Sequence, residues 1–231
     1  MEMLTGSHLV EAGLDDWRHL AQGLHARFAV DGLATGAALA TGVADVASAD
    51  HDHVRLTMGH AHVDVRLASP DATFRDGSGV EHVVEWITQR DLDLARAISA
   101  LAASSGATAE PDAVVAVELG LDVASSATVA PVWAALLAGD PAARGRGTPT
   151  DEVRDATGRV PNLWFGGRDD AAASPWHLEL YVSAAESGRR IAAAVAAGGA
   201  IVDDAQAPGM TVVADQEGNR CVVCVQVDAA T

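Results

Sequence analysis

Residues 54–68 of the chain read VRLTMGHAHVDVRLA, and this stretch decides the fold of the first half. From residue 62 onward Val63, Val65 and Leu67 alternate with polar side chains, the period of two that is typical of a strand with one buried face. Residues 54–58 form a second strand-like run, and the short MGHA segment between the runs favours a hairpin. The stretch therefore predicts antiparallel strands with one covered face.

Segments with helical periodicity lie on both sides of this hairpin. Residues 33–47 are rich in Ala with helical spacing, and Thr88 with Asp91 three residues later is a capping pair that starts another helix. Residues 9–20 predict an opening helix and residues 24–30 a strand. Segregated helices and antiparallel strands predict an α+β fold for this half.

The composition changes between residues 100 and 112, where the chain becomes small and polar, and we expect a domain boundary there. The predicted domains are residues 1–104 and 113–231. In the second domain the order strand, helix, several strands occurs twice, which predicts a paired βαβββ architecture. The Gly-rich run at 144–155 is expected to be a loop.

Composition excludes several classes of protein. Hydrophobic residues at 49% exclude a disordered chain, and a net charge of −17 disfavours nucleic acid and anionic membranes as partners. The sequence holds no apolar run of about 18–20 residues and no basic flank before an apolar leader, so we expect a cytoplasmic protein without a membrane span. Cys221 and Cys224 lie in a strand-like run and are interpreted as packed small side chains.

Three stretches of the first half, GLHARFAVDGLATGAAL, DHVRLTMGHAHVDVRL and ITQRDLDLARAISAL, resemble the pterin-4a-carbinolamine dehydratase family. The resemblance covers about residues 4–103. It implies a hydro-lyase that removes water from 4a-hydroxytetrahydropterins. Such a reaction needs an acid for the leaving hydroxyl and a base for the N5 proton, and imidazole suits both roles near neutral pH.

This chain has only part of the family's catalytic residue pattern. Its His-His-Pro falls on Asp52, His53 and Val54, so the resemblance implies His53 as the acid or base, with the Asp52 carboxylate in place of one imidazole. The family's third histidine falls on Pro70, which cannot transfer protons, although the following acid is kept as Asp71.

An insertion follows Asp71 at residues 72–85. The stretch 69–79 is rich in turn-forming residues, and 80–87 is strand-like. Its His82 is either a replacement for the lost imidazole or an exposed member of an added hairpin. Trp86 is a candidate for stacking on a pterin ring.

The remaining histidines of the first half allow two other interpretations. The cluster of His51, His53, His60 and His62 suggests a metal site. Strand geometry places only His60 and His62 on one face, so we prefer a polar strand face with one catalytic imidazole. Three histidines nearer the N-terminus, His8, His19 and His25, are expected at the surface.

In the second half AVELGLDV, WHLELYV and ADQEGN resemble the vicinal-oxygen-chelate, or glyoxalase-like, superfamily over about residues 113–227. That resemblance implies an eight-stranded sheet curled into a cup. Metal-dependent members hold four ligands inside it, and Glu118 and His177 match two of those positions. The position of another ligand is Val222, and the end of the first module offers Trp164 without an acid. Two donors hold a divalent ion weakly, so we expect neither metal nor cofactor.

Three functions stay open at this point. The first is a hydro-lyase with a degenerate site at His53, Asp52, Asp71 and His82, fused to a glyoxalase-like ligand-binding domain. The second is a non-catalytic protein that binds a pterin-like or other aromatic heterocycle, with Trp86, Glu118, Trp164 and His177 as candidate contacts; the alternative for Glu118 and His177 is a buried, satisfied pair. The third and weaker one is metal-dependent glyoxalase or dioxygenase chemistry. The oligomeric state is left open.

Overall fold

The structure, a computed structural model, describes residues 1–143, 152–154, 158, 160–167 and 174–225. These divide into two compact units, Met1–Val114 and Val115–Val225. None of the described helices is both long and apolar enough to cross a membrane.

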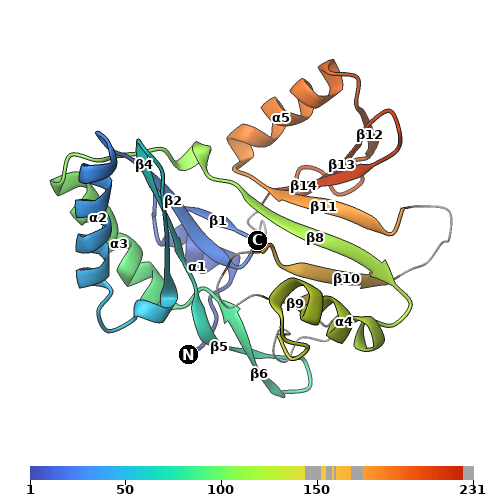
Figure 1. The fold of residues 1–231 in the computed structure, drawn as a ribbon, viewed down its shortest axis with the longest axis horizontal. Coiled ribbons are helices and arrows are strands. Elements are labelled where there is room, and N and C mark those ends of the chain that lie inside the picture. The colour runs from blue at the N-terminus through green and yellow to red at the C-terminus, as the bar shows by residue number, and fades with distance from the viewer. Residues whose placement is uncertain (144–151, 155–157, 159, 168–173, 226–231) are drawn as a thin grey trace. The chain divides into compact units, whose positions relative to one another are not determined.

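The first unit is an antiparallel sheet in the order β1-β2-β4-β3, with β7 paired to the edge of β2, and it is covered on one face by α2 and α3 (Figure 1). A short α1 precedes the sheet. The strands are β1 (Arg18–Leu20), β2 (Gly23–Ala29), β3 (Val54–Met58), β4 (His62–Leu67) and β7 (Thr108–Ala109); the helices are α1 (Gly6–Glu11), α2 (Leu33–Val46) and α3 (Gln89–Ser104), with 3-10 turns at His51–His53 and Pro111–Ala113.

The predicted alternation builds the core of this unit. Phe28 of β2 pairs with Val63 of β4, and both are at most 1% exposed. Leu39 of α2 and Ile98 of α3 pack onto the same side of the sheet. The apolar residues are buried because each lies at the period of its own element, two in the strands and 3.6 in the helices. The two halves of the expected hairpin are β3 and β4, as the MGHA turn predicts.

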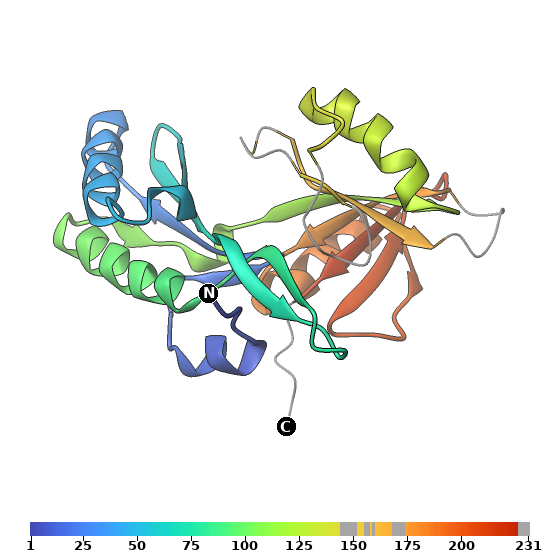
Figure 2. The same cartoon turned by 90° about the horizontal axis from the view of Figure 1, so that it is seen from below.

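Two predicted segments of this half differ from the structure. The opening helix ends at Glu11, because Gly13 takes φ +61° in the left-handed region and the chain turns away, which leaves Trp17 to enter the core from a loop. The stretch 69–79 is mainly strand rather than turn: β5 (Ser69–Arg75) pairs with β6 (Glu81–Trp86) as a separate hairpin that projects from the unit (Figure 2).

The second unit is one sheet in the order β12-β13-β14-β11-β8-β10-β9. The described residues give seven strands where the resemblance implied eight. Parallel pairs β10–β8 and β14–β11 flank the antiparallel pair β8–β11, so the two predicted modules join at their first strands. The elements are β8 (Ala116–Val123), α4 (Ser126–Ala138), β9 (Glu152–Val153), β10 (Leu163–Gly167), β11 (Trp176–Tyr181), α5 (Ala184–Ala196), β12 (Ala200–Asp203), β13 (Met210–Ala214) and β14 (Arg220–Cys224).

Both helices of this unit pack on the same face of the sheet, since they contact residues of one strand parity. Helix α4 covers Leu121, Leu163 and Phe165, and α5 covers Val182 and Val223. Most of the loop expected at 144–155 lies outside the described residues, and its residues 152–153 form β9. The opposite face, which we call the open face, carries the residues between these apolar positions.

Two of the three histidines expected at the surface, His19 and His25, are only partly exposed, and both ring nitrogens of His19 are buried. His25 of β2 is partly covered, and its Nε2 is a buried atom for which the described residues offer no hydrogen-bond partner. Burial, followed by the nearby charges of Arg66 and His19, lowers the pKa of His25 from 6.5 to about 3, against weaker opposing effects of a Leu20 backbone hydrogen bond and Asp64.

This lowered pKa predicts acid sensitivity. Between pH 6.5 and about 3 the unfolded chain binds a proton at His25 that the folded chain rejects, so the unfolding free energy falls as the pH falls. We expect His25→Gln to remove part of that slope, up to about 1.4 kcal/mol per pH unit. Urea denaturation of the wild type and the variant at several pH values measures the difference. The exposed His60→Gln is the control, and equal slopes in wild type and His25→Gln would contradict the assignment.

Candidate functional site

His53 ends the 3-10 turn that leads into β3, and only 4% of it is exposed. Its Nδ1 lies 2.9 Å from Oδ1 of Asp91 and 3.1 Å from Oγ of Ser69. A carboxylate only accepts hydrogen bonds, so Nδ1 is the nitrogen that carries the proton. The ring is therefore held in one tautomer with Nε2 as its remaining acceptor.

Asp91 comes from the capping box that starts α3. Its Oδ2 accepts from the Thr88 backbone N–H at 2.7 Å, from the Thr88 hydroxyl at 3.1 Å and from the Ser69 hydroxyl at 2.7 Å. Asp91 and Ser69 are fully buried, and Thr88 is 1% exposed. One carboxylate thus caps a helix, fixes the start of β5 and orients His53. Sequence reasoning found the capping pair but missed this second task, although Asp91 belongs to the stretch that carries the family resemblance.

The other predicted residues of the first unit do not gather around the imidazole. Asp52 and Asp71 are both exposed, and the hydrogen bonds of His53 among the described residues go to Asp91 and Ser69. Asp52 lies in the 3-10 turn, directly before His53 in the sequence, and Asp71 lies on β5. Pro70, at the position of the family's third imidazole, is exposed on the same strand.

His82 and Trp86 both lie on β6. The Nε2 of His82 is 3.0 Å from Oδ2 of Asp76, and its ring stacks on Phe74, so it is partnered within the hairpin. Four residues of strand, about 13 Å, separate it from Trp86, which is paired with Ser69 beside His53. The hairpin therefore holds His82 away from the imidazole. The indole N–H of Trp86 donates to the Leu4 carbonyl at 2.9 Å, and the ring meets His19 edge to face.

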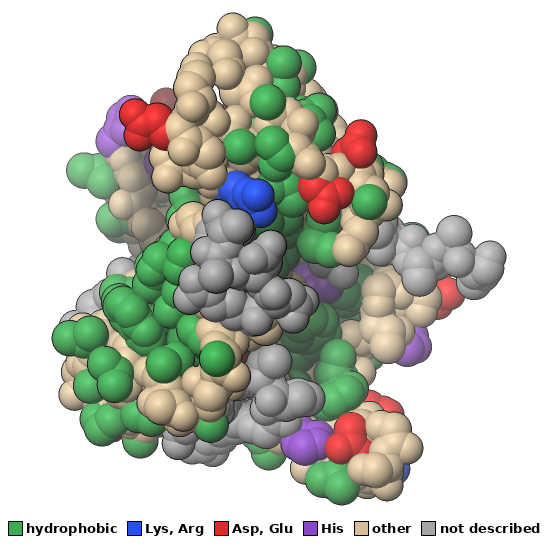
Figure 3. Space-filling model, turned by 90° about the vertical axis from the view of Figure 1, so that its right-hand side faces the viewer, with side chains coloured by type: hydrophobic (Ala, Val, Ile, Leu, Met, Phe, Trp, Pro, Cys, Tyr) green, Lys and Arg blue, Asp and Glu red, His purple; other side chains and the backbone are tan. Residues whose placement is uncertain are grey.

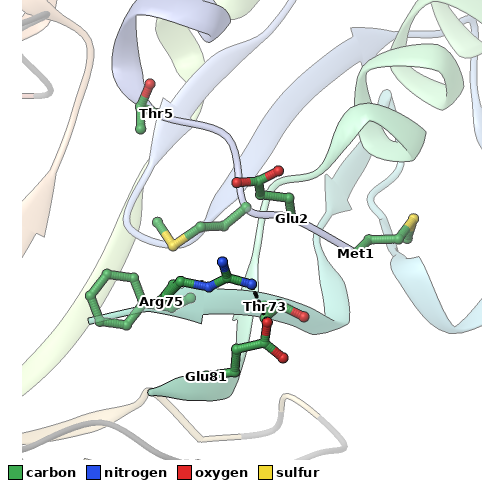
Figure 4. Close-up of a pocket in the computed structure, with 8 residues that line it drawn as sticks. Met1, Glu2, Thr5, Thr73, Arg75 and Glu81 are labelled. Atoms are coloured by element: carbon green, nitrogen blue, oxygen red, sulfur yellow. Dashed lines mark hydrogen bonds and ion pairs between the residues drawn. The ribbon is translucent and has the colours of Figure 1, made fainter. Parts of the chain in front are cut away.

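A pocket of about 500 Å³ lies between the N-terminal segment and the β5–β6 hairpin (Figure 4). Its lining includes Met1, Glu2 and Phe74, together with the ion pair of Arg75 and Glu81. None of the residues predicted from sequence lines it. The cavity is thus separate from the His53 network.

In the second unit Glu118 is the centre of the open face. It is only 3% exposed, and its carboxylate accepts from Asn162 Nδ2 at 3.0 Å and from the indole N–H of Trp164 on β10. Strand β10 runs parallel to β8, and Trp164 is the cross-strand partner of Gly120. Gly120 lies two residues along β8 from Glu118. Two of the predicted contact residues, Glu118 and Trp164, are therefore in direct contact.

His177 and Glu179 lie on β11 across from these residues. Glu118 is the direct cross-strand partner of Glu179, and His177 is the partner of Gly120, where a Cβ would come within 2.1 Å of the imidazole. The absence of a side chain at Gly120 leaves the room on β8 that the His177 ring occupies. The structure thus brings Glu118, Trp164 and His177 to one face.

Glu179 balances this face electrostatically. Its carboxylate lies 3.6 Å from His177 Nε2 and accepts from the Tyr181 hydroxyl at 2.8 Å. The close approach of the Glu179 carboxylate raises the pKa of His177, and the imidazole in turn lowers the pKa of Glu179, so both favour their charged forms. Burial, and then Glu179, raises the pKa of Tyr181, and burial raises the pKa of the Cys224 thiol to about 12. A thiol with a raised pKa is a weaker nucleophile near neutral pH.

The donors of the open face do not form a metal site. Val222 on β14 is the parallel partner of Glu179, and it has no ligating atom at the place where the family supplies a carboxylate. Within the described residues no three His, Cys, Asp or Glu side chains are grouped as ligands. The geometry here does not fit a divalent ion, which needs three or more protein donors.

Family models match both halves of the chain. A model described as pterin 4 alpha carbinolamine dehydratase matches residues 4–101, and one described as a glyoxalase-like domain matches residues 118–224. Both resemblances seen in the sequence are thereby confirmed, and the chain is a fusion of the two. No curated protein matches the chain significantly.

The buried carboxylate of Asp91 gives a stability prediction. Asp91→Ala leaves the Thr88 N–H, the Ser69 hydroxyl and His53 Nδ1 without their acceptor, and we expect a loss of about 3 kcal/mol or more. Urea denaturation followed by circular dichroism measures it. Asp93→Ala, on the same helix and exposed, should change the unfolding free energy by less than about 0.5 kcal/mol. A similar small effect for both variants would refute the role given to Asp91.

Proposed function

We propose that this chain, which joins a pterin 4 alpha carbinolamine dehydratase domain to a glyoxalase-like domain, binds a small aromatic heterocycle on the open face of its glyoxalase-like sheet. The observation that carries the proposal is the buried Glu118 carboxylate, held from two sides by Asn162 and Trp164. A group fixed in this way needs no reordering when it meets a ligand.

The chemistry of Glu118 indicates the kind of ligand. The Glu118 carboxylate already accepts from the N–H groups of Asn162 and Trp164, which shows that both of its oxygens lie where N–H donors can reach them. An amino-substituted heterocycle such as a pterin presents adjacent N–H donors, which match the two oxygens of a carboxylate. The indole of Trp164 and the imidazole of His177 supply flat surfaces for the ring.

Binding without turnover is the function favoured for the first domain as well. Dehydration of a carbinolamine needs an acid and a base, and two of the three family imidazole positions hold Asp52 and Pro70. The retained His53 is 96% covered and engaged with Asp91 and Ser69. A single imidazole that is held at Nδ1 supplies at most one of the two proton-transfer roles that the reaction needs.

One observation favours a hydro-lyase as the second candidate. Asp91 holds Nδ1 of His53 in the way a carboxylate orients a catalytic imidazole, which leaves Nε2 as a base. In that function His53 would act as the acid or base, and the exposed carboxylates Asp52 and Asp71 would assist. His82, bound to Asp76, would contribute only after leaving that partner.

Calorimetric titration of the full chain with pterin tests the binding proposal. We expect Glu118→Gln to weaken binding at least tenfold, because a charge-assisted hydrogen bond is lost. Trp164→Phe should also weaken binding, while Glu217→Gln, at an exposed position, should leave the Kd unchanged within twofold. Unchanged affinity in both Glu118→Gln and Trp164→Phe would place the ligand elsewhere.

Stopped-flow measurement of carbinolamine dehydration separates the two candidates. For a binding protein we expect the wild-type rate to equal the uncatalysed rate. A wild-type acceleration that His53→Gln reduces by about 100-fold or more, and that His60→Gln leaves intact, would instead establish the hydro-lyase. Folding of the His53 variant is checked by its thermal unfolding, since the residue is buried.

A further inference from the structure

A group of apolar side chains lies on the open face of the second unit, beside the carboxylates already described. Val222 of β14 is the cross-strand partner of Glu179, and Val212 of β13 is the partner of Val222. One row across four strands therefore reads Glu118, Glu179, Val222 and Val212, with all four side chains on the same face. The two carboxylates occupy one half of this row and the two valines occupy the other.

The neighbouring rows extend this apolar region along the same two strands. On one side of the valines Met210 and Cys224 are cross-strand partners, and on the other side Ala214 is the partner of Arg220. Met210 is 40% exposed, and both valines are partly exposed. We call the following five residues the apolar patch: Met210, Val212, Ala214, Val222 and Cys224.

The apolar patch is separate from the cores of this unit. Val213 and Val223, the next residues along the two strands, point to the opposite face and pack under α5. Val212 and Val222 do not belong to that cluster of described residues. The hydrophobic side chains that gather over α4 (Figure 3) are also separate from the patch, because α4 packs on the opposite face of the sheet. The patch is thus an apolar surface within a polar face.

We propose that the apolar patch binds a small alkyl or aryl substituent of the heterocycle whose polar edge contacts Glu118. The inference rests on the proposed function and narrows its ligand from any heterocycle to an amphipathic one. Val222 lies two strand spacings, about 10 Å, from Glu118. A two-ring heterocycle that hydrogen-bonds to Glu118 and lies across β8 and β11 therefore brings its far edge to Val222.

The chemistry of the patch selects an apolar substituent over a polar one. Valine and alanine side chains have no hydrogen-bonding atoms, and the sulfur atoms of methionine and cysteine form only weak hydrogen bonds. A polar group placed over the patch would lose its water without regaining those hydrogen bonds. An apolar group placed there gains free energy because it leaves water.

The size of the patch selects a small group over a macromolecule. A protein interface takes about 20–30 residues from each partner, far more than the patch contains. Carboxylates also bound the patch, since Glu179 is the partner of Val222 on one side and the exposed Asp203 is the partner of Val212 on the other. The apolar width between them is two strands, about 10 Å. A short alkyl chain or one aromatic ring matches this width.

Calorimetric titration of the full chain with two ligands, pterin and a pterin with a propyl group at C6, tests the proposal. A fully buried methylene tightens binding about fourfold, so a propyl group that is about half covered should lower the Kd of the wild type about tenfold. We expect Val222→Thr and Met210→Gln each to reduce this gain to about threefold or less. Val195→Thr, at a 43% exposed position of α5 on the other face, is the matched control and should keep the tenfold gain.

The outcomes separate this inference from the proposed function. Equal affinity of the wild type for both pterins, with binding that Glu118→Gln still weakens, would overturn the inference and leave the proposed function in place. No binding of either pterin would overturn both. A tenfold gain that persists in Val222→Thr and in Met210→Gln would place the propyl group elsewhere and also overturn the inference. Because the ratio of the two Kd values is taken within each variant, and circular dichroism checks its fold, a general loss of stability does not imitate the effect.

Discussion

The fully buried Asp91 carboxylate is the constraint on which the first unit depends. A buried charge is tolerated only when its hydrogen bonds are complete, and three neighbours from separate parts of the chain complete them: Thr88, Ser69 and His53. This requirement joins the start of α3, the start of β5 and the turn before β3 at one point. The position of the insertion hairpin follows, because β5 leaves the core from Ser69.

The second unit differs from the first because its partly buried charges lie on a sheet rather than at a helix end. Strand alternation sends the apolar side chains to α4 and α5 and leaves Glu118, His177 and Glu179 on the open face. Glu118 and Glu179 are direct cross-strand neighbours, which is unfavourable for two carboxylates unless each is compensated. Trp164 and Asn162 compensate the first, and His177 and Tyr181 compensate the second. The resulting polar layer is ordered before any ligand arrives.

Sequence patterns predicted what depends on neighbouring residues and failed where distant contacts decide. The period of two found β4, and the Thr88–Asp91 spacing found the start of α3, because these signals are local. Ser69, Pro70 and Asp71 favour a turn locally, and the strand at 69–75 exists because Ser69 and residues 72–75 pair with β6 across an irregularity at 70–71. Likewise His25 has an ordinary strand position, and only its packing gives it the pKa of a buried group. The contact between Glu118 and Trp164 required the register of β10 on β8, which no spacing in the sequence contains.

The hydrogen bonds around Asp91 also give His53 a structural role. In a family whose reaction uses several imidazoles, the presence of His53 suggests chemistry. Yet removal of the His53 ring would leave an oxygen of the buried Asp91 without its donor, which is costly whether or not a substrate is bound. Asp52 and Asp71, which lack such a bond to the core, are exposed, and Pro70 has lost the imidazole altogether. The position that keeps its imidazole is thus also one where the buried Asp91 needs a hydrogen-bond donor, so the presence of His53 does not by itself indicate catalysis.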